Sequence, residues 1–81
     1  MKREEVFAKL TEILREEFED DELVVSDETT AADVEGWDSL THLSIVHEIE
    51  SEFGIKLTMG EIQGSKNVGE FVDSIVRHLE S

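Results

Sequence analysis

The stretch DSLTHLSIVHEIESEFG, residues 38–54, predicts the central helix of the fold. Its large apolar residues recur at spacings of three and four, the repeat that places side chains on one face of an α-helix. Asp38 can accept hydrogen bonds from the free N–H groups of a first helical turn, and Gly54 is a typical helix stop. We therefore predict a helix that begins at Asp38 or Ser39 and ends near Phe53. Its buried side is expected to contain Leu43, Ile45, Val46, Ile49 and Phe53.

Three further helices flank this one. Apolar residues at the same spacing predict a helix over Arg3–Phe18. Thr58-Met-Gly-Glu61 and Asn67-Val-Gly-Glu70 both have the pattern of a capping box, which satisfies free backbone N–H groups at a helix start. The first box opens a very short helix with Ile62 facing inward, and the second opens a helix that continues to Leu79. No segment alternates as a strand does, so we predict an all-α fold: a small four-helix bundle of three main helices and a short third one.

A long connection, Glu19–Asp38, separates the first two predicted helices. Connections of this length are unusual in a compact domain and are often functional. Within it, Thr29–Asp33 has the composition to form a turn of helix. Its acids do not reproduce the ligand spacing of a calcium-binding loop, so we expect no dedicated metal site. Three apolar residues are expected to fold back onto the core: Leu23, Val24 and Val25.

The chain is strongly acidic, with 21 acidic and 7 basic residues and a formal net charge of −14. No Lys or Arg lies between Glu16 and Ile55, and fourteen of the acids lie in that stretch. Such a field repels nucleic acid and anionic lipid and attracts basic protein surfaces. The sequence has no Cys for disulfides or a thiolate zinc site, and no apolar run reaches the roughly 20 residues of a membrane span. We expect a cytoplasmic monomer that binds neither nucleic acid nor membrane.

Ser39 is the residue most able to carry chemistry. It stands at the first turn of the predicted central helix, directly after the long connection, so its hydroxyl is expected to be exposed. The positive end of a helix favours an anion at this place. Serines are also common as ordinary capping residues, so position alone leaves both interpretations open.

The residues around Ser39 carry a family resemblance. Gly36-Trp-Asp-Ser-Leu40 resembles the attachment motif of acyl carrier proteins, and Glu52-Phe-Gly-Ile55 resembles the run that closes the second helix in that family. The acidic loop and the order of the helices are similar over nearly the whole chain. The resemblance implies a carrier and not an enzyme. It implies a 4′-phosphopantetheine arm that is transferred from coenzyme A to the oxygen of Ser39 and whose thiol holds an acyl group as a thioester.

The resemblance also implies surroundings and partners for the arm. Trp37, Asp38 and Leu40 would flank the attachment site, and the acyl chain would lie between the second and fourth helices. The partners would be a phosphopantetheinyl transferase and acyl-processing enzymes of fatty acid, polyketide or related specialised pathways, with basic docking surfaces. Ser44 and Ser51 stand where fatty-acid carriers of the family usually have acids, which leaves the identity of these enzymes open. The expected docking residues are Leu40, Ser44, His47, Glu48, Ser51, Glu52 and Glu61.

Three other functions could use an acidic chain with this serine. An aminoacyl carrier, such as one for D-alanine, remains an alternative. A non-carrying acidic adaptor explains the charge but not the motif. A hydrolase built on Ser39 and His42 is disfavoured, because the chain lacks the G-x-S-x-G turn and the length for a substrate pocket.

The sequence also predicts the environments of Trp37 and His42 and the extent of the domain. Trp37 is expected to anchor the loop with a partly exposed ring. His42 is expected to be half-buried and hydrogen-bonded, with a contact to the arm as the alternative. Met1 and the absence of a Pro/Ala-rich linker predict a free-standing protein in which residues 1–81 form a single carrier domain.

Overall fold

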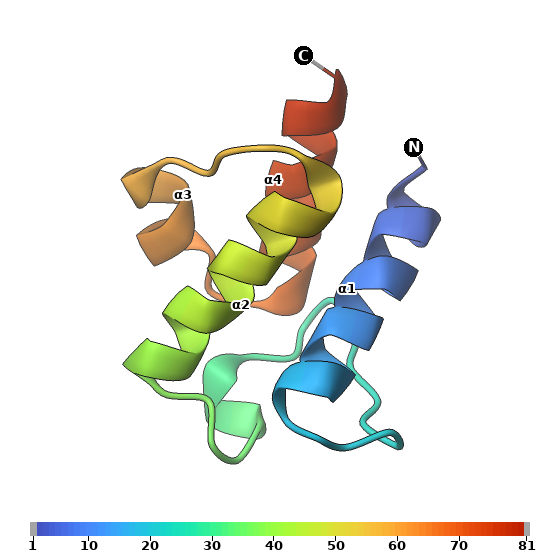
Figure 1. Ribbon diagram of the computed structural model, residues 1–81, viewed down its shortest axis with the longest axis vertical. Coiled ribbons are helices and arrows are strands. Elements are labelled where there is room, and N and C mark those ends of the chain that lie inside the picture. Colours follow the sequence, from blue (N-terminus) through green and yellow to red (C-terminus); the bar gives the residue numbers. More distant parts are fainter. Residues whose placement is uncertain (1, 81) are drawn as a thin grey trace.

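The computed structural model describes residues 2–80 and is helical throughout its regular elements (Figure 1). The all-α prediction of three main helices and a short third one is confirmed, and the described residues contain no strand. Met1, from which a free-standing chain is expected, lies outside the described residues. The elements in chain order are α1 (Arg3–Glu17), the 3-10 turn η1 (Ala31–Asp33), α2 (Ser39–Phe53), α3 (Met59–Gly64) and α4 (Val68–Glu80).

The three long helices enclose one apolar core. α1 packs against both α2 and α4, while α3 contributes no fully buried residue and lies at the edge of the bundle (Figure 1). Ile62 of α3 packs against the core, in agreement with its predicted inward orientation. The buried residues are Val6, Leu10, Ile13 and Leu14 of α1, Ile45, Val46 and Ile49 of α2, Val68, Phe71, Val72 and Ile75 of α4, and Val25 and Leu57 of the connections.

Two apolar residues that we expected in the core are exposed instead. Leu43 is 56% exposed, because it lies at the edge of the buried face of α2, on a flank that no neighbouring helix covers. Val24 is 81% exposed, because neighbouring side chains of an extended segment point in opposite directions and Leu23 and Val25 take the inward side. Spacing alone therefore assigned too wide a buried face to α2.

The two predicted capping boxes differ in completeness. At α3, the Glu61 N–H donates to Thr58 Oγ1 at 3.1 Å and the Thr58 N–H donates to Glu61 Oε1 at 2.9 Å, so this box is confirmed. At α4, the Glu70 N–H donates to Asn67 Oδ1 at 2.9 Å as expected. The Glu70 carboxylate, however, accepts from the N–H of Lys66 at 3.3 Å and not from that of Asn67. Only the cap half of the second box is thus present.

The long connection between α1 and α2 is fixed to the start of α4 by its backbone. The N–H of Val68 donates to the Thr29 carbonyl at 2.9 Å, and the N–H of Gly69 donates to the Asp27 carbonyl at 2.9 Å. The first N–H groups of a helix have no partner inside the helix, so the connection satisfies donors that would otherwise be free. A Cβ on Gly69 would lie 2.9 Å from the Asp27 carbonyl oxygen, and this close approach requires glycine.

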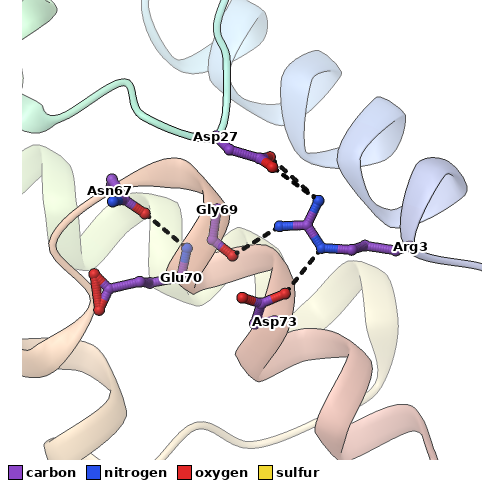
Figure 2. A network of polar contacts seen from close by, with 6 residues as sticks. All are labelled: Arg3, Asp27, Asn67, Gly69, Glu70 and Asp73. Atoms are coloured by element: carbon purple, nitrogen blue, oxygen red, sulfur yellow. Dashed lines mark hydrogen bonds and ion pairs between the residues drawn. The ribbon is translucent and has the colours of Figure 1, made fainter.

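Arg3 reinforces the same junction from the start of α1, as Figure 2 shows. Its guanidinium donates to Asp27 Oδ2 at 3.1 Å and to Asp73 Oδ1 at 2.9 Å, and its Nη2 donates to the Gly69 carbonyl at 3.4 Å. One planar donor group thus joins α1, the connection and α4. Nothing in the local sequence pattern signals this role, because Arg3, Asp27 and the α4 turn that contains Gly69 and Asp73 are far apart in the chain.

Replacing Gly69 by Ala tests the close approach. We expect Gly69→Ala to lower the free energy of unfolding by about 2 kcal/mol, and the melting temperature by about 10 °C, because backbone atoms of Asp27 must move. The matched control is Gly64→Ala, since a Cβ at Gly64 meets nothing within 4 Å. Thermal unfolding followed by circular dichroism measures both, and equal melting temperatures for the two variants would contradict the packing at Gly69.

Candidate functional site

Ser39 is the first residue of α2 and its side chain is exposed. Asp38 precedes it as the N-cap: its Oδ1 accepts from the Thr41 N–H at 2.9 Å, and this backbone hydrogen bond is the main reason that the pKa of the Asp38 carboxyl lies below its usual value. The predicted cap at Asp38 is therefore confirmed, and Gly54 ends the helix in the left-handed conformation with a φ of 65°. The result is a hydroxyl at the positive end of a well-formed helix.

Trp37 and His42 hold the segment around Ser39 against the bundle. The Trp37 ring is half-buried and lies 5.8 Å from the ring of Phe18, centroid to centroid. His42 is also half-buried, and both its ring nitrogens have partners: Trp37 Nε1 at 3.1 Å and the Ile62 carbonyl at 3.0 Å. The expected anchoring of the loop by Trp37 and the expected half-buried, hydrogen-bonded His42 are both present.

An open groove of about 550 Å³ lies beside Ser39, between α2 and α3. Its lining includes Ser39 itself and two apolar side chains that are largely exposed, Leu43 at 56% and Met59 at 64%. Sequence reasoning placed Leu43 in the core and did not single out Met59. The sequence could have indicated the exposure of Met59, because a large apolar residue in the first turn of a very short helix has few neighbours to cover it.

The groove is not where we expected the acyl chain to lie. Between α2 and α4, side chains fill the interior, and Ile45, Ile49 and Phe71 are at most 2% exposed. The groove instead lies between α2 and α3. The position of α3 is set by contacts between distant residues, so a pattern within one helix could not locate it.

Six of the seven expected docking residues form one exposed surface on α2, which we call the α2 face: Leu40, Ser44, His47, Glu48, Ser51 and Glu52. Leu40 is 80% exposed. Two residues of the face touch α1, since Ser44 Oγ donates to Glu17 Oε1 at 2.9 Å and Lys9 Nζ pairs with Glu52 Oε1 at 3.3 Å. Glu17 was not singled out from the sequence, although it brings a carboxylate to a serine of this face.

Glu61, the seventh expected docking residue, is a brace between α3 and α4. Its carboxylate accepts from the Thr58 N–H at 2.9 Å and lies 2.8 Å from His78 Nε2. The Thr58 backbone hydrogen bond, followed by the contact with His78, lowers the pKa of Glu61 from 4.5 to about 2. This half-buried carboxylate already has two partners within the protein, and its role in docking stays a prediction.

Comparisons with known proteins agree with this geometry. Residues 8–75 match the family model described as a phosphopantetheine attachment site. An acyl carrier protein of Thermotoga maritima is 36% identical over 77 residues, which cover 95% of each chain. The solution structure of a holo acyl carrier protein from Geobacter metallireducens has a TM-score of 0.87 and 39% identity, covering 93% of this chain and 86% of that one. A crystal structure of a Thermotoga maritima acyl carrier protein has a TM-score of 0.84 and 30% identity, covering 99% of this chain and 93% of that one.

The chain belongs to the acyl carrier protein family, whose members bear a phosphopantetheine attachment site. It carries acyl groups on a phosphopantetheine arm, and carriers of this family are not catalysts. The family also implies that its partners are a phosphopantetheinyl transferase and acyl-processing enzymes. The hydrolase and the non-carrying adaptor are thereby excluded as its function.

Two further findings concern residues 2–80. No helix in this range is long and apolar enough to cross a membrane. Within the same range, no three His, Cys, Asp or Glu side chains are grouped so that they could hold a metal ion.

The brace at Glu61 predicts a defined dependence of stability on pH. Because folding lowers the pKa of Glu61, its contribution is present above the ordinary value of 4.5 and is lost as the pH falls toward about 2. Between these limits the Glu61→Gln variant should lose less stability than the wild type. Glu12→Gln on the exposed side of α1 makes the same change in charge and should follow the wild type. The measurement is the melting temperature of each protein across this pH range. If the melting temperatures of wild type and Glu61→Gln fell in parallel with pH, Glu61 would not brace α3 against α4.

Proposed function

We propose that Ser39 is the residue to which the phosphopantetheine arm is attached. The observation that carries this assignment is an exposed hydroxyl at the first turn of α2, at the edge of an open groove, in a chain whose family is defined by such an attachment. A transferase must bring coenzyme A to the acceptor oxygen. Ser39 offers that oxygen without any covering side chain.

The surroundings of Ser39 fit a phosphodiester and an extended arm. The N-terminal end of α2 provides a favourable field for the negative charge, while the Asp38 carboxylate is already engaged by the Thr41 N–H. Trp37, Asp38 and Leu40 flank the attachment point, and the groove runs past Leu43 and Met59. When bound, the arm supplies the thiol that the chain lacks, since the sequence contains no Cys.

The cargo that the groove supports best is an acyl group. Leu43 and Met59 give the groove an apolar rim beside Ser39, and apolar surface favours hydrocarbon over a charged aminoacyl group. We therefore favour an acyl carrier over the alternative of an aminoacyl carrier such as one for D-alanine. The carrier delivers its cargo to separate enzymes of fatty acid, polyketide or related specialised biosynthesis.

We further propose that the α2 face is the surface on which partner enzymes dock. Leu40 offers an exposed apolar contact next to Ser39, and Glu48 and Glu52 add negative charge along the same helix. The stretch from Glu16 to Ile55 has no Lys or Arg, so this side of the molecule attracts basic surfaces. On this proposal the chain acts in the cytoplasm as a monomer, with residues 1–81 as one carrier domain.

Intact-mass spectrometry tests the attachment site. Incubation of the apo protein with coenzyme A, Mg²⁺ and a broad-specificity phosphopantetheinyl transferase should add one phosphopantetheine to the wild type and none to Ser39→Ala. Ser26→Ala, which removes another exposed hydroxyl from the loop, should be modified like the wild type. Modification of Ser39→Ala would place the arm elsewhere, and an unmodified wild type would contradict the proposed function.

Steady-state kinetics of the same transfer test the α2 face. Glu48→Gln should lower kcat/KM by about threefold at low salt, because one attractive charge is lost from the encounter surface. The difference should vanish near 1 M salt, where the Debye length is about 3 Å. Glu12→Gln has the same net charge as Glu48→Gln but lies on α1, and it should keep the wild-type rate. Equal losses in both variants would mean that only total charge matters.

A further inference from the structure

His42 makes two hydrogen bonds that together fix its tautomer. An indole N–H can only donate, so Trp37 Nε1, 3.1 Å away, must donate to an unprotonated His42 Nδ1. The proton of the neutral ring is then on Nε2, which donates to the Ile62 carbonyl at 3.0 Å. The imidazole thus works as a bridge with one accepting end and one donating end.

The bridge joins three parts of the molecule next to Ser39. Trp37 belongs to the loop before α2, Ile62 belongs to α3, and the ring of Phe71 in α4 lies 5.2 Å from the His42 ring, centroid to centroid. Both Trp37 and His42 line the groove that contains Ser39. α3 is otherwise a short helix at the edge of the bundle without a fully buried residue, so a side-chain bond to its backbone matters for where it lies.

The hydrogen bond between Trp37 and His42 joins the chain segments on the two sides of Ser39. Trp37 precedes Ser39 by two residues and His42 follows it by three, so their hydrogen bond spans the first turn of α2 from outside. A second side-chain bond runs the same way, from Thr41 Oγ1 to the Gly36 carbonyl at 3.1 Å. The exposed hydroxyl therefore stands on a turn whose two sides are tied together.

We propose that His42 is a positioning residue for the loading of the carrier. Its imidazole holds the Ser39 turn and α3 in fixed relation, so that the hydroxyl is presented to the transferase in one orientation and the groove beside it stays open. His42 does not touch the reacting atoms and acts through Trp37 and Ile62. The inference rests on the proposed attachment at Ser39.

Two substitutions separate the hydrogen bonds from the packing of the ring. His42→Phe keeps an aromatic ring against Phe71 and Trp37 but removes both nitrogens. His42→Gln gives up the ring but retains one acceptor and one donor on its amide. Trp37→Phe removes the donor on the other side of the bridge and serves as an independent variant in case His42→Phe does not fold.

The kinetic test measures kcat/KM for phosphopantetheine transfer from coenzyme A to the folded apo protein. Loss of the bridge should lower kcat/KM about fivefold in His42→Phe and in Trp37→Phe, the order expected when one hydrogen bond no longer holds the reactive geometry. The double variant should be no slower than His42→Phe, because His42→Phe already removes the bond that Trp37→Phe removes. His42→Gln should recover most of the wild-type rate.

The spectroscopic test uses the one Trp of the chain. In ¹H–¹⁵N spectra of the wild type, the imidazole of His42 should show an unprotonated Nδ1 and a protonated Nε2, and the indole N–H of Trp37 should be shifted as a hydrogen-bonded donor. His42→Phe should move the indole signal toward that of an unbonded indole. His47→Phe, the same substitution at an exposed position of α2, should leave the indole signal in place.

The outcomes distinguish this inference from the proposed function. No transfer to the wild type would overturn both. Transfer at equal rates to wild type and His42→Phe would overturn the inference alone, as would a His42→Gln variant as slow as His42→Phe. Slow transfer to His42→Phe and Trp37→Phe, with recovery in His42→Gln and the predicted tautomer, supports it.

Discussion

The first turn of α4 and the connection between α1 and α2 share a pair of backbone hydrogen bonds, and the position of Ser39 depends on them. The carbonyls of Asp27 and Thr29 accept from the N–H groups of Gly69 and Val68. A helix start needs partners for its free donors, and a long acidic loop needs a fixed point against the core. The loop carbonyls accept from the free N–H groups of α4, and these bonds hold the loop against the core. Arg3 adds ion pairs to Asp27 of the loop and to Asp73 of α4.

From that fixed point the chain has a short path to Ser39. After η1, Trp37 packs against Phe18 and bonds to His42, and Asp38 then caps α2. These contacts explain how a long, highly charged connection can present one hydroxyl in a defined place. The folded chain holds Ser39 in place, whereas the phosphopantetheine arm provides the thiol that carries the acyl group. The absence of Cys from the sequence is consistent with this division of labour.

The sequence predicted what depends on local pattern and missed what depends on distant contacts. Spacing of apolar residues located the three long helices, and cap chemistry located the short helix and the starts at Asp38 and Thr58, because both effects act within one or two turns. The groove between α2 and α3, the role of Arg3 and the structural role of Glu61 join residues far apart in the chain. The exposure of Leu43 also depends on distant contacts, because the placement of neighbouring helices decides which flank of α2 is covered. Attachment at Ser39 stays a prediction from its motif, and the structure places this residue, as expected, exposed at a helix start.

Attachment at Ser39 can be tested by locating the arm on the protein after co-production with a phosphopantetheinyl transferase. Proteolysis followed by tandem mass spectrometry assigns the added group to a single residue within the peptide that contains it. We predict phosphopantetheine on the oxygen of Ser39 and on no other hydroxyl. A modification mapped to a different serine or threonine, or a protein that stays unmodified beside an active transferase, would contradict it.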